Sequence, residues 1–260
     1  MSIDKKTQRY LIYGGIAVII VIIIAVMAIN GSFNQLIHDF ERDFIKYNRY
    51  EFVLTGLKNT IIITIASLIL GLILGTVAAI VRGIHDLNGT MPVLNAVFKL
   101  YITVIRGTPM LVQLLIIYYV IFASVNINQI LVASIAFGIN SGAYVAESIR
   151  AGINAVPKGQ LEAASSLGMP FSMSMVLVIL PQAIRNILPA LGNENISLLK
   201  ETSIAGYIGV IDLTRAGDLI RAQTYDAMLP LIVIALIYLA VVLVLQYLIG
   251  RLERRLNSAY

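Results

Sequence analysis

Polar and ionisable side chains interrupt one apolar stretch in the second half of the sequence. Glu194 and Asn195 lie there, followed by Ser197 and Lys200. The spacing of Glu194, Ser197 and Glu201 places their side chains on one face of a helix. Because an ionisable group in an apolar span is costly, such a face usually borders a cavity or a partner. One interpretation is a path for a polar solute, lined by Glu194, Asn195, Ser197 and Lys200. The alternative is that Glu194 and Asn195 lie at the membrane–water interface on the external side and stay hydrated.

A second polar stretch lies between two apolar segments, at residues 158–167. Pro157 can occupy the first turn of a helix, and Gly168 can adopt the left-handed conformation that ends one. These residues predict a helix of about two to three turns over Lys158–Leu167. Its small alanine and serine side chains suit insertion into a groove of another protein. The alternative is a helix that rests on lipid, which would need bulky apolar residues on one face and basic residues on the other.

Catalytic and metal-binding chemistry have little support in this sequence. The absence of cysteine excludes disulfides, thiol catalysis and cysteine-based zinc sites. His38 and His85 fall in different predicted loops on opposite sides of the membrane, so neither a metal site nor a catalytic triad is expected. No G-x-x-x-x-G-K-[ST] loop is present to hold nucleotide phosphates.

The overall composition indicates a membrane protein. The 260 residues are 58% hydrophobic and 13% charged, with a mean hydropathy of +0.86. Soluble domains carry about 45–50% apolar and about 25% charged residues. The formal charge of +5 is not gathered into any densely basic stretch, so membrane orientation accounts for it better than nucleic-acid binding does.

Apolar runs of about 20 residues can cross a bilayer as helices. The uncharged run 107–146 is too long for one such helix, and its only polar break is Ser124–Gln129. The region 171–205 is apolar but broken by prolines and charges, and is expected to be a span lined on one side by protein or water. The six predicted spans are Leu11–Ile29, Asn59–Val81, 100–123, 130–150, 171–205 and Ala227–Gly250.

Six spans place both termini on one side of the membrane. More of the 19 Lys and Arg residues fall in the segments next to the termini and in the loops on that side. The positive-inside rule therefore predicts that both termini are cytoplasmic. We expect an N-terminal anchor over residues 1–30, an extracytoplasmic connector over 31–52, and a core over 53–256 with a cytoplasmic loop at about 154–171. The first span could instead be a cleaved signal, although its apolar run exceeds the usual length of about 7–15 residues.

The cytoplasmic loop carries a pattern known from one transporter family. Glu162-Ala163-Ala164, with Gly168 and then Val178-Ile-Leu-Pro181, resembles the EAA loop of permease subunits in binding-protein-dependent ABC importers. That family usually has isoleucine where this chain has Val178. Further stretches are similar to its polar amino-acid branch, and the resemblance covers about residues 53–256. These stretches are Arg106–Leu114, Ala143–Arg150, Leu180–Pro189 and Lys200–Ser203.

The resemblance implies an all-α membrane protein with the five-span type I importer core plus one extra N-terminal transmembrane helix. It implies that the loop helix docks in a cleft of a cytoplasmic ATP-binding cassette dimer, so that ATP and Mg are bound by that partner and this chain is not itself an enzyme. A second permease subunit, identical or a sibling, and an extracytoplasmic amino-acid-binding protein would complete a system in the bacterial inner membrane. The implied coupling positions are Gly159, Glu162, Ala163, Ala164 and Gly168.

Two other functions remain open on the sequence. An ion-gradient-driven secondary transporter would carry inverted repeats with paired broken helices, whereas only one broken span is predicted here. A non-transporting membrane scaffold would use Glu162 and Glu194 merely to brace helices. The amino-acid substrate itself is not readable from the sequence.

Overall fold

The computed structural model describes residues 32–258. In that part of the chain the secondary structure is helical throughout, and the predicted anchor over residues 1–30 lies outside it. The elements are α2 (Ser32–Phe40), η1 (Glu41–Ile45), η2 (Lys46–Asn48), α3 (Tyr50–Asn88), α4 (Pro92–Gly107), α5 (Met110–Ile116), η3 (Ile117–Ile121), α6 (Gln129–Asn154), α7 (Lys158–Ser166), α8 (Phe171–Ser174), η4 (Met175–Ile179), α9 (Leu180–Glu201), η5 (Thr202–Ile208), α10 (Leu213–Thr224) and α11 (Met228–Ser258).

Long apolar helices confirm a multi-span protein. Within residues 32–258, four helical stretches are long and apolar enough to cross a membrane: α3, α6, the run from α8 to η5, and the Met228–Arg255 part of α11. The broken region 171–205 is thus one continuous helical run, with the π-helical segment η4 and the internal Pro189 inside it. The predicted turn at Ser124–Gln129 is confirmed, because η3 ends at Ile121 and α6 begins at Gln129.

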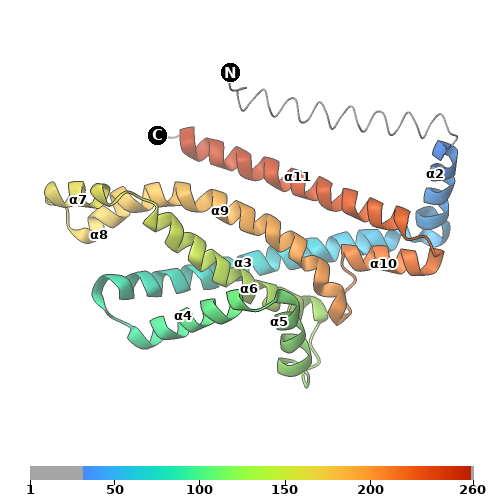
Figure 1. Ribbon diagram of the computed structural model, residues 1–260, viewed down its shortest axis with the longest axis horizontal. Helices are drawn as coiled ribbons and strands as arrows, with labels where there is room; N and C mark the ends of the chain where they lie inside the picture. Colours follow the sequence, from blue (N-terminus) through green and yellow to red (C-terminus); the bar gives the residue numbers. More distant parts are fainter. Residues whose placement is uncertain (1–31, 259–260) are drawn as a thin grey trace.

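The predicted span 100–123 is not one continuous helix in the structure. α4 and the continuous α5–η3 helix are bent by 112° at Thr108 and Pro109, so the segment is a pair of helices with a break between them rather than one helix. Figure 1 shows α5 turning away from the direction of α4. Pro109 is extended, with ψ 136°, and its missing N–H prevents the helix from continuing.

A buried amide side chain stabilises this bend. Gln113 is 7% exposed, and its Nε2 donates hydrogen bonds to Ile105 O at 2.7 Å and Thr108 O at 3.0 Å. These carbonyls at the end of α4 lack helical partners. Asn140 Nδ2 of α6 in turn donates to Gln113 Oε1 at 3.0 Å. The bend is therefore fixed by a contact between helices that no local pattern encodes.

The core lies between α3 and α6, and small residues bring the two helices together. A Cβ added at Gly71 would lie 2.9 Å from the Ser141 hydroxyl, and one at Gly75 would lie 2.6 Å from Cβ of Val145. The Gly71–Gly75 pair is thus a G-x-x-x-G contact that only glycine permits.

Each end of the molecule carries short helices. Figure 1 shows α7 and α8 at one end and α2 and α10 at the other, with α11 running back toward the α7 end. His38 lies in the last turn of α2 and His85 in the last turn of α3. Both therefore lie in helices rather than in irregular loops: His38 in the short helix α2, and His85 in α3, which extends beyond its apolar part into polar sequence as far as Asn88.

The α10 end is held by a buried carboxylate. Asp212 is fully buried and caps α10, accepting hydrogen bonds from Thr214 N at 2.7 Å, Arg215 N at 2.9 Å and Gly206 N at 2.6 Å. Burial nevertheless raises the pKa of Asp212 to about 6, because desolvation outweighs these three donors.

Candidate coupling helix and substrate path

Helix α7 (Lys158–Ser166) coincides with the helix predicted between the apolar segments. Pro157 precedes it as the N-cap, with an extended ψ of 132°. Gly168 follows with φ +77°, the left-handed conformation expected of a residue just beyond a helix. Gly168 N donates to Ser165 O at 2.9 Å, and Met169 N donates to Ala164 O at 3.1 Å. Together with the bond from Leu167 N to Ala163 O, they satisfy the carbonyls of Ala163, Ala164 and Ser165 before the chain turns into α8.

The residues in the middle of α7 differ in exposure. Glu162 and Ala163 are exposed, whereas Ala164 is 4% exposed and faces the rest of the chain. The hydroxyls of Ser165 and Ser166 donate back to carbonyls of α7 itself, at 2.9 Å each. Glu162 and Ala163 therefore face outward, as do Lys158, Gly159 and Gln160 at the start of α7, while Ala164 packs against the rest of the chain.

The base of α7 is joined to the following span. Gln182 Nε2 of α9 donates to Gln160 Oε1 at 3.2 Å and to Val178 O at 2.9 Å. Leu161 packs against the apolar cluster of Val156, Ile179, Ala183 and Ile187. Since Val178 and Ile179 belong to the π-helical segment η4, these contacts join α7 to the first part of this span.

The predicted path residues divide between different sides of α9. Glu194 lies beside Ser141 of α6 and interacts electrostatically with Glu201 and Arg106. Ser197 and Glu201 are half-buried, as is Glu194. Glu194, Ser197 and Glu201 all belong to helix α9, so their spacing puts them on one face of it, as expected.

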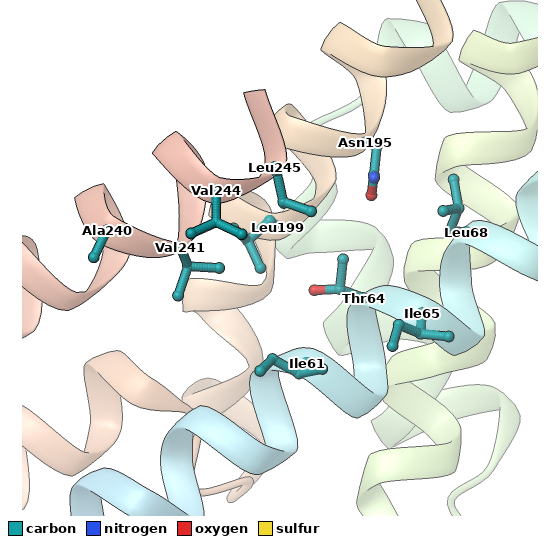
Figure 2. A pocket seen from close by; sticks show the side chains of 10 residues that line it. All are labelled: Ile61, Thr64, Ile65, Leu68, Asn195, Leu199, Ala240, Val241, Val244 and Leu245. Atoms are coloured by element: carbon teal, nitrogen blue, oxygen red, sulfur yellow. The ribbon is translucent and has the colours of Figure 1, made fainter. Parts of the chain in front are cut away.

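Asn195 and Lys200 point elsewhere. Asn195 lines a largely apolar hollow of about 410 Å³ between α3, α9 and α11, where its buried Oδ1 has no hydrogen-bond partner (Figure 2). Thr64 is the other polar residue in that lining. The remaining lining residues are apolar: Ile61, Ile65, Leu68, Leu199, Ala240, Val241, Val244 and Leu245. Lys200 is exposed and borders a small pocket with Ser203, Thr214 and Tyr238. The four residues therefore do not form one cluster around Glu194.

An ionic cluster missed on the sequence lies between α3, α4 and α6. Glu147 and Arg150 are three residues apart on α6, and Arg150 binds both carboxylate oxygens of Glu147. Arg82 Nη1 and Arg106 Nη1 also approach Glu147 Oε2, at 3.8 Å and 3.9 Å. The Arg106 guanidinium also lies over the Tyr144 ring, 5.3 Å from its centroid. Only tertiary packing brings these arginines together.

Comparison with known proteins gives consistent results. An arginine transport system permease protein of Bacillus subtilis (strain 168) is 42% identical over 209 residues, covering 80% of this chain and 93% of the relative. An L-cystine transport system permease protein of the same organism is 40% identical over 217 residues, covering 83% and 91%. A glutamine transport system permease protein of Escherichia coli (strain K12) is 38% identical over 208 residues, covering 79% and 93%.

Solved structures and a family model agree with these relatives. The crystal structure of an amino acid ABC transporter with histidines matches with a TM-score of 0.73 at 45% identity, covering 81% of this chain and 96% of the other. A MetNI methionine ABC transporter matches in fold, with a TM-score of 0.66 at 17% identity, covering 79% and 96%. The family model described as "Binding-protein-dependent transport system inner membrane component" matches residues 71–258. This chain therefore belongs to the family of inner-membrane components of binding-protein-dependent transport systems.

Proposed function

We propose that this chain is the permease subunit of an ATP-driven, binding-protein-dependent importer of polar or charged amino acids. A separate ATP-binding cassette dimer binds ATP and Mg and drives the spans through α7. A second permease subunit, identical or a sibling, completes the pore, and an extracytoplasmic binding protein delivers the amino acid. Both termini of the permease lie in the cytoplasm.

The observation that carries this proposal is the position and attachment of α7. It projects at one end of the molecule with Glu162 and Ala163 exposed, and its Gln160 is hydrogen-bonded to α9 at Gln182. Small exposed residues on a short helix fit a groove on a partner. Attachment to a span gives the partner's movement a direct route into the membrane.

The amino-acid class is inferred from two supports. The relatives named for arginine, glutamine and cystine transport match most of the chain. Glu194, half-buried within a membrane helix, offers a carboxylate to an ammonium or a cationic side chain. Glu194 and Ser197 are accordingly the proposed path residues, while the orientations of Asn195 and Lys200 place them on other sides of α9.

Reconstitution tests the proposal against its main alternatives. Vesicles containing the permease, with and without its ATPase and binding protein, would be assayed for uptake of labelled arginine, glutamine and histidine. We expect uptake of at least one of them that requires all components and ATP. Uptake that needs no ATPase and collapses with the ion gradient would instead support a secondary transporter, and no uptake in any combination would support a scaffold.

A further inference from the structure

A hollow of about 280 Å³ lies beside α7, between the ends of α3 and α6 and the start of the following span (α8 and η4). Its walls are mainly apolar and include Leu87, Val156, Leu161, Phe171, Met175 and Ile179. Leu161 of α7 is half-buried, whereas the outward-facing Glu162 and Ala163 are not among the lining residues. A partner that holds the outer face of α7 therefore leaves this hollow uncovered.

The hollow lies at the level where lipid hydrocarbon gives way to headgroups. The apolar run predicted as a span ends at Val81, just before Gly83 in the wall of the hollow. Asp86, one turn further along α3, has 63% of its side chain exposed. Leu87 of α3 and Phe171 of α8 are nevertheless 58% and 44% exposed. Exposed apolar side chains beside charged ones are typical of the boundary between acyl chains and headgroups.

Basic side chains predominate at the hollow and directly behind it. Arg150 and Lys158 line it, together with one carboxylate, that of Asp86. Behind the wall, the Glu147 carboxylate is bound by Arg150 and approached by two further arginines. These groups comprise four cations, Arg82, Arg106, Arg150 and Lys158, and two carboxylates, Asp86 and Glu147. The cations thus outnumber the carboxylates by two, so the site attracts an anion.

Two donors remain available at the hollow. Lys158 is exposed, and no ion pair within 4.0 Å among residues 32–258 involves its ammonium. Arg150 binds Glu147 through Nε and Nη2, which leaves its Nη1 without a hydrogen bond to any residue in that range. Lysine and arginine donors of this kind bind phosphate oxygens. A basic pocket between membrane helices on the cytoplasmic side can bind the headgroup of an anionic phospholipid.

We propose that this hollow binds an anionic phospholipid of the cytoplasmic leaflet. Its phosphate contacts Lys158 and Arg150, and one acyl chain lies against Leu87 and Phe171. Because Lys158 and Leu161 belong to α7, the bound lipid contacts the helix proposed to couple to the ATPase. The choice of the cytoplasmic leaflet rests on the import function proposed above, whereas the binding of the lipid does not.

Fluorescence quenching by brominated lipids tests the site. The chain contains no tryptophan, so Phe171→Trp places a single reporter in the wall of the hollow. The full-length reporter protein is reconstituted in mixed vesicles of phosphatidylglycerol and phosphatidylcholine, with bromine on the acyl chains of one lipid or the other. We expect phosphatidylglycerol to be preferred about 5-fold, the factor that one basic residue near a membrane surface contributes. Leu87→Trp, from the α3 side of the hollow, provides a second reporter if Phe171→Trp does not fold.

Removing the Lys158 charge tests recognition of the headgroup. In the reporter protein, Lys158→Gln should abolish the 5-fold preference while both lipids still quench the tryptophan. Arg254→Gln is the matched control, because Arg254 is an exposed basic residue near the end of α11 that does not line the hollow. This variant should keep the preference.

Filling the hollow tests whether an acyl chain enters it. A Cβ at Gly83 meets nothing within 4 Å, so Gly83→Phe can occupy the space without a clash and should lower quenching by both lipids. Gly250→Phe is the matched control, because Gly250 on α11 has equally open surroundings but lies outside the lining. It should leave quenching unchanged.

Three results would refute the lipid site. Equal quenching by the two lipids in the reporter protein would mean that the headgroup is not recognised. An equal loss of preference in Arg254→Gln would assign the preference to the general surface charge. Quenching by neither lipid would mean that a protein segment covers the hollow.

The proposed import function is tested separately by ATP-driven uptake in the same vesicles. Uptake without a preference for phosphatidylglycerol would refute the lipid site and leave the import function standing. A preference that is lost in Lys158→Gln, in a protein that transports no amino acid with its partners present, would support the lipid site and count against the import function.

Discussion

Replacing Gly168 with alanine isolates the conformation that ends α7. A Cβ at this position meets open space within 4 Å, so the substitution causes no steric clash. Its φ of +77° is instead unfavourable for any side chain, at a cost of about 1–2 kcal/mol. That cost corresponds to a factor of about 5–30 in the population of the native turn. We therefore expect Gly168→Ala to weaken binding of the ATPase by up to this factor, without loss of membrane insertion.

The assay is affinity of the purified permease for its ATPase subunit, together with ATP-driven uptake in vesicles. Gly89→Ala is the matched control, because Gly89 ends α3 with φ +68° and also has open space around it. It should carry similar strain but leave ATPase binding unchanged. Gly168→Asn should lose less than Gly168→Ala, since asparagine tolerates left-handed backbone better.

Two results would refute this reasoning. Wild-type ATPase affinity in Gly168→Ala would mean that the turn after α7 does not set the docking geometry. An equal loss in Gly89→Ala would mean that general destabilisation, not the position of α7, is responsible.

Three further predictions follow from other parts of the molecule. Glu162→Lys reverses an exposed charge on α7 and should abolish co-purification of the ATPase while the permease still inserts; wild-type yield of the complex would contradict this. Gln113→Leu leaves Ile105 O and Thr108 O without their donor and should lower the free energy of unfolding by about 1–3 kcal/mol, measured by thermal unfolding in detergent, whereas an unchanged melting temperature would exclude this role. In the wild type the contribution of Asp212 should make the melting temperature fall as the pH rises from about 4 to 6, and Asp212→Asn should abolish this decrease.

The sign of the Asp212 effect follows from its pKa. The folded-state pKa of about 6 lies above the ordinary value of 3.8, so the folded protein holds this proton more tightly than the unfolded chain. The contribution of Asp212 to stability is therefore fully present below about pH 4 and is lost as the pH rises through 6. A difference between wild type and Asp212→Asn that does not change over this pH range would contradict the assignment.

Local patterns in the sequence predicted the elements that local chemistry determines. Proline and glycine delimit α7 because their backbone preferences act at single positions, and the left-handed Gly168 agrees with that expectation. Long apolar runs likewise predicted α3, α6 and α11, because lipid requires a continuous helix. The ends of these helices were less predictable, since α3 extends through polar residues to Asn88.

Features that depend on contacts between helices were missed. The sequence predicted one span over 100–123, but the 112° bend within it depends on Gln113 reaching back to α4 and on Asn140 of α6. The approach of Arg82 and Arg106 to Glu147 joins residues from different helices. Helical spacing within α9 grouped Glu194 with Ser197 and Glu201, but it gave no reason to separate Asn195, which lines the apolar hollow (Figure 2).

A photo-crosslinker placed at Ala163 tests most directly whether α7 is the contact through which ATP hydrolysis drives transport. Ala163 is exposed near the middle of α7, so a short probe there samples whatever lies against the helix. In the complete importer, during ATP turnover, we expect crosslinks to the ATPase subunit. Crosslinks to phospholipid alone under the same conditions would contradict the account.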